Sequence, residues 1–331
     1  MPPNSTPRQT SARALTMPRR ALPALLLAGP ALAQDWPSRP IRLIVPFTPG
    51  GPVDVVARLL AERLRDRLGQ PVVIENRAGA GGSLGVRLVA TSPPDGTAFV
   101  LTSSSLAIWP AMHPQGGLDP RQDLTPVSLV ADIATTIVAR PEPRLGDLAA
   151  LLRAARAAPG GITYGTSGIG SSNHLSGALF AAMAGVALTH VPYRGASVAM
   201  NALLARDIEI VFASTVETLP AHRDGRARIL AVTTPGRIPS LPDVPAAIEA
   251  VPGYVAPNWF ALAGPPGLPP AMLARLSAEL ALLRQDAGFV TRLADLGAIA
   301  VLSAPEVLAA RLAEDIPNWR RVAEAAGIRA E

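Results

Sequence analysis

The 331-residue sequence contains no cysteine and no lysine. Without cysteine, disulfides, thiolate nucleophiles, zinc–cysteine sites and iron–sulfur clusters are excluded. Without lysine, a P-loop and Schiff-base chemistry are excluded, because the first needs a lysine at the phosphates and the second an amine. Aromatic residues make up only 4%, which argues against base-stacking platforms for nucleic acid. No HExxH-type metal motif exists among the histidines, which are His113, His174, His190 and His222.

Hydrophobic residues make up 49% of the chain and charged residues 17%, which is typical of a globular protein. The formal net charge of +5 comes mainly from the first 33 residues, which hold four arginines and no acid. Beyond them, arginines and acids nearly balance and are interspersed. No basic stripe of the kind that contacts a phosphate backbone is present, so we expect no nucleic-acid partner.

Residues 17–34 have the three parts of a secretory signal peptide. Arg19 and Arg20 precede a short apolar run, and Ala31-Leu32-Ala33 is a small-x-small cleavage site. We expect cleavage after Ala33 and export to the periplasm by the general route. The run is too short for a membrane-spanning helix, which needs about 20 residues. Met17 is an alternative start, since residues 1–16 add nothing to the signal.

Strand-like apolar runs alternate with helical patterns along the rest of the chain. Ile41–Phe47 reads as a strand, and the apolar spacing from Val53 to Leu68 predicts a helix that ends at Gly69. Such alternation predicts an α/β fold with a mainly parallel sheet. We place passages between two α/β domains near Val130–Ala134 and Val232–Pro235. This gives one discontinuous domain of residues 34–131 and 234–331, and a second of residues 132–233.

Two glycine-rich loops each follow a predicted strand and precede a predicted helix. The first spans residues 46–54, where Gly50 and Gly51 allow close backbone approach and a helix start favours an anion. A purely structural turn explains this loop equally well. The second spans residues 164–174 and adds hydroxyls and an amide. One such loop in each domain predicts a cleft that holds an anionic ligand from two sides.

Other motifs give weaker evidence for a ligand site or for catalysis. The serines after the strand near Ala98–Thr102 either add hydroxyls to the cleft or form an ordinary helix N-cap. The glycines of residues 79–85 miss the G-x-G-x-x-G fingerprint because Leu84 stands at its last position, so we interpret them as a structural turn. No G-x-S-x-G and no poised acid–base pair is present, so we expect no catalytic residue. His190 in its apolar strand is expected to be a buried, satisfied residue.

A series of short motifs resembles one family over nearly the whole mature chain. It begins with Pro37–Phe47 and Pro49-Gly50-Gly51-x-x-Asp54, continues through Gly69–Arg77, and includes Tyr164-Gly165-x-Ser167-Gly168, His190–Gly195 and Leu241–Pro245. Each motif is weak alone, but the ordered series is similar to the Bug-type receptors, the extracytoplasmic solute receptors of tripartite tricarboxylate transporters.

The resemblance implies a type II periplasmic binding protein fold, with two α/β domains and a ligand cleft between them. It implies a receptor without enzyme activity, cofactor or metal, which binds a small organic carboxylate as a monomer and delivers it to the membrane subunits of the transporter. The matching positions imply these ligand-binding residues: Phe47, Thr48, Gly50, Gly51, Asp54, Ser103, Ser104, Ser167, Gly168, Asn173 and His174.

Two further positions depart from the family. Members often have lysine where this chain has Arg194, and Asp or Asn near Ala213-Ser214. Arg194 either pairs with a distal carboxylate of the ligand or is a surface or domain-packing residue. Ser214 is included as a ligand-binding residue. The ligand class stays open between di- or tricarboxylates, amino acids and aromatic acids. The alternative functions are an exported hydrolase and a carboxylate sensor without a transport role.

Overall fold

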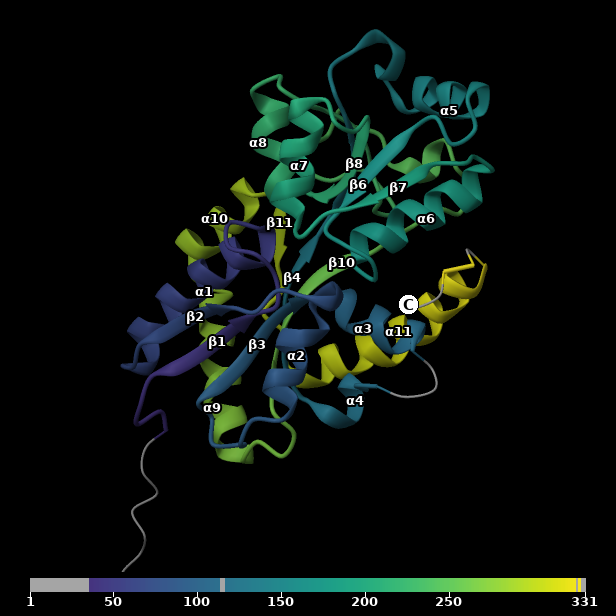
Figure 1. Cartoon of the computed structure of the whole chain (residues 1–331). Helices are drawn as coiled ribbons and strands as arrows, with labels where there is room; N and C mark the ends of the chain where they lie inside the picture. Colours follow the sequence, from purple (N-terminus) through teal and green to yellow (C-terminus); the bar gives the residue numbers. More distant parts are fainter. Residues whose placement is uncertain (1–35, 114–116, 326, 329–331) are drawn as a thin grey trace, which may run out of the picture. The chain divides into compact units, whose positions relative to one another are not determined.

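The computed structural model describes residues 36–113, 117–325, 327 and 328 (Figure 1). The predicted signal peptide and its cleavage site after Ala33 lie outside the described residues. In the described part, no helix is both long and apolar enough to cross a membrane.

The eleven described strands form two separate sheets. The six-stranded sheet has the order β11-β4-β10-β3-β1-β2, and its strands are β1 (Ile41–Val45), β2 (Val72–Asn76), β3 (Ala98–Ser103), β4 (Thr125–Ile133), β10 (Asn258–Gly264) and β11 (Ala298–Ala300). The five-stranded sheet has the order β7-β6-β8-β5-β9, and its strands are β5 (Thr135–Ala139), β6 (Thr163–Thr166), β7 (Thr189–Pro192), β8 (Ile210–Ser214) and β9 (Arg228–Val232).

Helices surround both sheets (Figure 1). Those that follow strands of the six-stranded sheet are α1 (Pro52–Leu68), α2 (Ser83–Ala90), α3 (Ser105–Met112), α4 (Pro120–Asp123), α9 (Pro270–Leu283), α10 (Ala287–Asp295) and α11 (Pro305–Ala325). Those that follow strands of the five-stranded sheet are α5 (Leu148–Ala157), α6 (Ser172–Ala184), α7 (Ala196–Ala205) and α8 (Thr215–Arg223). We call each sheet with its helices a lobe, the first lobe holding six strands and the second five.

Local sequence signals explain how the elements begin and end. Helix α1 starts with Pro52 at its first position, buries the predicted face from Val53 to Leu68, and ends at Gly69 with φ +68°. Only glycine adopts that left-handed conformation without steric cost, so the helix stops there. Asp147 caps α5, because its carboxylate accepts a hydrogen bond from the amide of Ala150 at 2.6 Å.

The expectation of a mainly parallel sheet is wrong. Strands β1–β3 and β6–β8 pair in parallel, as strand–helix–strand units must. Strands β10, β11 and β5, however, all pair antiparallel to their neighbours. These three strands follow the passages of the chain between the two sheets or return from the C-terminal helices, which reverses their direction.

The first passage between the lobes is at Ala134, where β4 of the first sheet runs directly into β5 of the second. The second passage falls later than Val232–Pro235. Val232 still forms a parallel bridge with Ala246, and Ile238 and Leu241 pack into the second lobe's core. The chain returns to the first sheet only at Asn258, where β10 begins. Strands β4 and β10 therefore connect the lobes side by side (Figure 1).

Candidate functional site

A small cavity lies between the two lobes, at the ends of their strands. Its volume is about 30 Å³. The first lobe contributes Phe47, Thr48, Gly51, Pro52, Val53, Ser103, Asn258 and Phe260, and the second contributes Ser167, Ser172, Asn173, Ala196 and Ser214. None of these residues is charged. The wall consists of hydroxyls, amides, backbone, two phenyl rings and the aliphatic side chains of Pro52, Val53 and Ala196.

Five helices begin at this cavity. Gly51 caps α1, Ser103 precedes the cap of α3, Ser172 begins α6, Ala196 begins α7 and Ser214 caps α8. The first amides of a helix have no partner inside the helix, and the helix dipole places partial positive charge there. Positive potential from five helix ends therefore converges on a cavity that contains no cationic side chain.

Asp54 shapes the first loop but does not line the cavity. Its buried carboxylate accepts hydrogen bonds from the Gly50 amide at 2.9 Å, Arg58 Nε at 2.8 Å and Asn76 Nδ2 at 2.9 Å. Burial alone would raise the pKa of Asp54, but these hydrogen bonds, with Arg58 foremost, outweigh it and hold the pKa below its usual value. The Gly50 amide is thus used within the loop, and the Gly51 amide donates to Thr48 O at 3.3 Å.

The second loop is held by its own hydroxyls. Ser171 caps α6 by accepting from the His174 amide at 3.2 Å, and its hydroxyl donates to Gly168 O at 2.7 Å. Gly168 has φ +123° and its amide donates to Thr166 Oγ1. The loop therefore presents Ser167, Ser172 and Asn173 to the cavity and keeps Gly168 behind it.

His174, which is buried, and His190, which is half-buried, form a stacked pair behind the second loop. Their ring centroids are 4.1 Å apart, and His190 also stacks on Tyr164 at 4.9 Å. The Gly170 amide donates to His174 Nδ1, and His190 Nε2 lies 2.7 Å from Thr166 Oγ1. Burial lowers the pKa of each ring to about 4, so both are neutral at pH 7. His190 is hydrogen-bonded as expected, but it is half-buried rather than buried, and His174 supports the loop from beneath.

Two polar atoms at the cavity are buried without a hydrogen-bond partner among the described residues. They are Thr48 Oγ1 in the first lobe and Asn173 Oδ1 in the second. Buried polar atoms in native proteins are nearly always hydrogen-bonded, to protein or to something bound. Both residues belong to the cavity wall, so each lobe presents one unpaired polar atom to the same cavity.

Behind Ser214, outside the cavity wall, lies a buried carboxyl of the second lobe. Glu217 Oε2 accepts from Ser214 Oγ at 3.4 Å, while Glu217 Oε1 is buried and has no partner among the described residues. Burial raises the pKa of Glu217 to about 8, against the lowering effect of its bonds to Ser214. The carboxyl is therefore mostly protonated and neutral at pH 7. Sequence reasoning did not single out this residue, since nothing in its local pattern separates it from a surface helix acid.

The lobes touch at the edges of the cavity. A Cβ placed on Gly195 of the second lobe would lie 2.2 Å from Thr48 Oγ1 of the first. A Cβ on Gly81 of the first lobe would lie 2.7 Å from the Ile169 carbonyl oxygen of the second. Real Cβ atoms do not approach that closely, so glycine at both positions allows the loops to meet.

The structure brings together seven of the predicted site residues at the cavity wall: Phe47, Thr48, Gly51, Ser103, Ser167, Asn173 and Ser214. Gly50, Asp54, Gly168 and His174 support the loops from outside, and Ser104 donates to Asn258 Oδ1 at 2.9 Å. Arg194 is exposed and does not line the cavity. Sequence reasoning missed six wall residues, which are Pro52, Val53, Ser172, Ala196, Asn258 and Phe260.

Comparison with known proteins identifies the family. The model of the tripartite tricarboxylate transporter family receptor, TctC, matches residues 56–328. The chain belongs to this receptor family. Among curated TctC relatives, protein BugT of Bordetella pertussis is 37% identical over 308 residues, covering 91% of this chain and 93% of BugT.

Solved structures agree with this assignment. The periplasmic binding protein BugD superposes with a TM-score of 0.85 at 33% identity, over 89% of this chain and all of BugD. An R. palustris structure with adipate gives a TM-score of 0.85 at 34% identity, over 89% and 99% of the two chains. MatC from Rhodopseudomonas palustris with bound malate gives 0.82 at 32%, over 87% and 99%. The expected two-domain periplasmic binding fold is confirmed, and nothing supports the exported hydrolase.

The described residues hold no group of three or more His, Asp or Glu side chains placed to bind a metal ion. The site therefore consists of neutral hydrogen-bond donors and acceptors. Such an arrangement binds and orients an anion.

Proposed function

We propose that this TctC-family chain is a periplasmic receptor that captures a small organic dicarboxylate in the cavity between its lobes and delivers it to the membrane subunits of a tripartite tricarboxylate transporter. The observation that carries the proposal is the convergence of five helix N-termini on an uncharged cavity, whose wall includes unpartnered polar atoms from both lobes. Helix N-termini are natural anion sites, because their amides and dipoles point at the ligand.

Neutral donors are sufficient for one carboxylate. A hydrogen bond to a charged group contributes about 1.5–3 kcal/mol, and the wall offers hydroxyls from Thr48, Ser103, Ser167 and Ser214. The volume of about 30 Å³ has room for two water-sized atoms, which matches the two oxygens of one carboxylate. The phenyl rings of Phe47 and Phe260, also in the wall, contact the apolar chain of the ligand.

The preference for a dicarboxylate rests on relatives. Adipate and malate, each with two carboxylates, are present in the R. palustris structures that resemble this chain. The second carboxylate of such a ligand must lie beyond the small cavity. Arg194 is the residue we assign to it, since it directly precedes Gly195 at the contact between the lobes.

Binding is proposed to close the two lobes around the ligand. We place the first lobe at residues 36–133 with 258–325 and the second at residues 135–256, hinged where β4 meets β5 and where β10 begins. The contacts of Gly195 with Thr48 and of Gly81 with Ile169 then belong to the closed form. Cleavage after Ala33, export and a monomeric state complete the proposal.

Ligand-induced stabilisation tests the function directly. The purified protein is melted with adipate, malate, acetate and dimethyl adipate, the last being an uncharged match for adipate. A ligand at about 100 times its Kd adds about 2.7 kcal/mol to the free energy of unfolding. We expect adipate or malate to raise the melting temperature far more than acetate, and dimethyl adipate to have no effect.

Arg194→Gln separates the roles of the two carboxylates. If Arg194 binds the distal carboxylate, the variant loses affinity for dicarboxylates and keeps its affinity for monocarboxylates such as acetate. A response to dimethyl adipate equal to that for adipate would overturn a carboxylate site at this cavity. An equal loss for mono- and dicarboxylates in Arg194→Gln would show that Arg194 is structural.

A further inference from the structure

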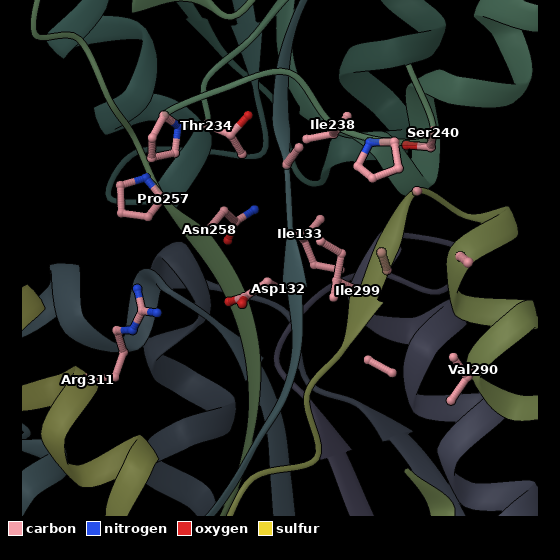
Figure 2. A pocket seen from close by; sticks show the side chains of 17 residues that line it. Asp132, Ile133, Thr234, Ile238, Ser240, Pro257, Asn258, Val290, Ile299 and Arg311 are labelled. Atoms are coloured by element: carbon pink, nitrogen blue, oxygen red, sulfur yellow. The ribbon is translucent and has the colours of Figure 1, made fainter. Parts of the chain in front are cut away.

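A second and much larger hollow lies where the lobes are joined (Figure 2). Its volume is about 680 Å³, within the range of about 300–1,000 Å³ that small-molecule sites occupy. Asn258, at the start of β10, lines both this hollow and the carboxylate cavity. The connecting strands therefore separate the two spaces, and we call the larger one the rear hollow.

Both lobes form the walls of the rear hollow. Figure 2 shows Ile238 and Ser240 from the segment that follows β9, facing Ile133, Val290 and Ile299 of the first lobe. The wall is mostly aliphatic, and Ile299 is 56% exposed although it is a large apolar side chain. An apolar molecule here would cover aliphatic surface that otherwise faces water.

Charge in the rear hollow is unbalanced toward the acidic side. Asp132 and Arg311 are the charged residues in its wall, and neither side chain takes part in a hydrogen bond or ion pair within the described residues. Asp315, one turn from Arg311 on α11, adds a second carboxyl, so two carboxyls, Asp132 and Asp315, lie close enough to one guanidinium to share its charge. Asp315 is already engaged, because it accepts from Trp259 Nε1 at 2.7 Å. Asp132 has no side-chain hydrogen bond within the described residues, and Figure 2 shows it at the centre of the wall. Burial raises the pKa of Asp132, and the charge of Arg311 offsets this only in part.

We propose that the rear hollow is a second ligand site, which binds an organic ammonium ion with an aromatic or branched apolar body. The ammonium group pairs with Asp132, and the apolar body packs against Ile133, Ile299 and Val290. Organic anions are disfavoured here, because they meet more carboxylates than cations. The two sites of the protein therefore select ligands of opposite charge.

Occupancy of the rear hollow is linked to the carboxylate cavity, and this part of the inference rests on the proposed function. An occupant that contacts both lobes stabilises the relative lobe position in which the rear hollow has this shape. In that position the loops around the carboxylate cavity also touch. Linkage then requires that the ammonium ligand tighten carboxylate binding, and that the carboxylate tighten ammonium binding by the same factor.

Calorimetry with two matched probes tests the rear hollow without any carboxylate present. Tryptamine carries an ammonium group and tryptophol is its neutral alcohol counterpart. We expect tryptamine to bind at least tenfold more tightly than tryptophol, and Asp132→Asn to bring the two within about twofold. Ala294→Trp fills the hollow from α10 and should weaken both probes at least tenfold. Ala287→Trp, at an exposed position on the same helix outside the wall, should change neither.

Equal binding of tryptamine and tryptophol to the unaltered protein would overturn the ammonium class. Tryptamine binding that survives Ala294→Trp, or no binding at all, would overturn the site. A second titration adds adipate at saturation and should increase tryptamine affinity. If tryptamine binds but adipate does not, the proposed function fails and the rear site stands. If both bind independently, the linkage is refuted while both sites stand.

Discussion

At the scale of single residues, we assign the Thr48 hydroxyl to ligand binding and not to the stability of the fold. Its hydroxyl is buried at the cavity and has no partner among the described residues, so folding gains nothing from it. Thr136 is a matched contrast, because its hydroxyl donates to Ala213 O at 2.9 Å and meets Thr218 Oγ1 at 3.0 Å. The two side chains have the same shape, but only the Thr136 hydroxyl is hydrogen-bonded within the described residues.

We predict that Thr48→Val weakens carboxylate binding by about 1.5–3 kcal/mol, the contribution of one hydrogen bond to a charged group. The same variant should unfold at the wild-type temperature or slightly above it. Thr136→Val should show the reverse, a lower melting temperature with unchanged affinity. Calorimetry and thermal unfolding measure both quantities. A Thr48→Val protein that binds like wild type would remove Thr48 from the site.

Glu217 is predicted to make the free energy of unfolding depend on pH. Its pKa is about 8 in the folded protein and near 4.3 when unfolded, so between these values the native state holds the proton more tightly. Stability from this group is complete below about pH 4 and is lost as the pH rises to 8. Glu217→Gln keeps the side-chain shape and cannot ionise.

Denaturant unfolding of wild type and Glu217→Gln from pH 5 to 9 measures the effect. The difference between the two proteins should grow by a few kcal/mol in favour of the variant as the pH rises. Taking the difference cancels the contribution of His174 and His190, whose low pKa values act in both proteins. A difference that stays constant across the range would show that Glu217 is not protonated in the native state.

At the scale of elements, the decisive parts are the turns at the ends of strands. The sequence predicts β1, α1 and the second loop well, because proline, glycine and serine mark their ends and the apolar spacing is regular. Strand β5 and helix α8 were not predicted. Strand β5 follows β4 with only Ala134 between them, and α8 follows β8 directly and contains Pro220, so no composition change separates these elements.

Gly81 offers a test of the contact between the lobes. Its φ is +62°, a conformation that asparagine also tolerates, and a Cβ there meets the Ile169 carbonyl oxygen at 2.7 Å. Gly69 has φ +68° and open space around it, so Gly69→Asn is a matched control in the same lobe. We predict that Gly81→Asn weakens dicarboxylate binding at least tenfold, about 1.4 kcal/mol. Gly69→Asn should bind as wild type does. Equal affinities in calorimetry would show that this contact plays no part in binding.

At the scale of the whole molecule, the sequence predicted the architecture better than the site. Two strand-to-helix loops were assigned to one cleft, and the structure brings both to one cavity. Asn258 and Phe260 were missed because they lie on β10, about 90 residues after the second loop. No local sequence pattern indicates that this strand returns to the cavity. The rear hollow was also beyond sequence reasoning, since it forms where β4, β10, β11 and α10 meet the segment of residues 234–240 from the second lobe.

Closure is predicted to be visible in solution scattering. We expect the radius of gyration of the ligand-free protein to fall when a dicarboxylate identified by melting is added, because binding brings the lobes together. Gly81→Asn should stay near the ligand-free value at the same ligand concentration. Superimposable scattering curves with and without ligand, when calorimetry shows the ligand bound, would contradict a hinge.

The absence of charge from the carboxylate cavity also bears on how the cargo is given up. A buried arginine or lysine would be left without its partner each time a carboxylate departed, at a cost of several kcal/mol. Helix ends and hydroxyls carry only partial charges, which water satisfies once the lobes separate. The described wall of the ligand-free cavity therefore holds no unpaired charged side chain, and release of the ligand requires only that the lobes separate.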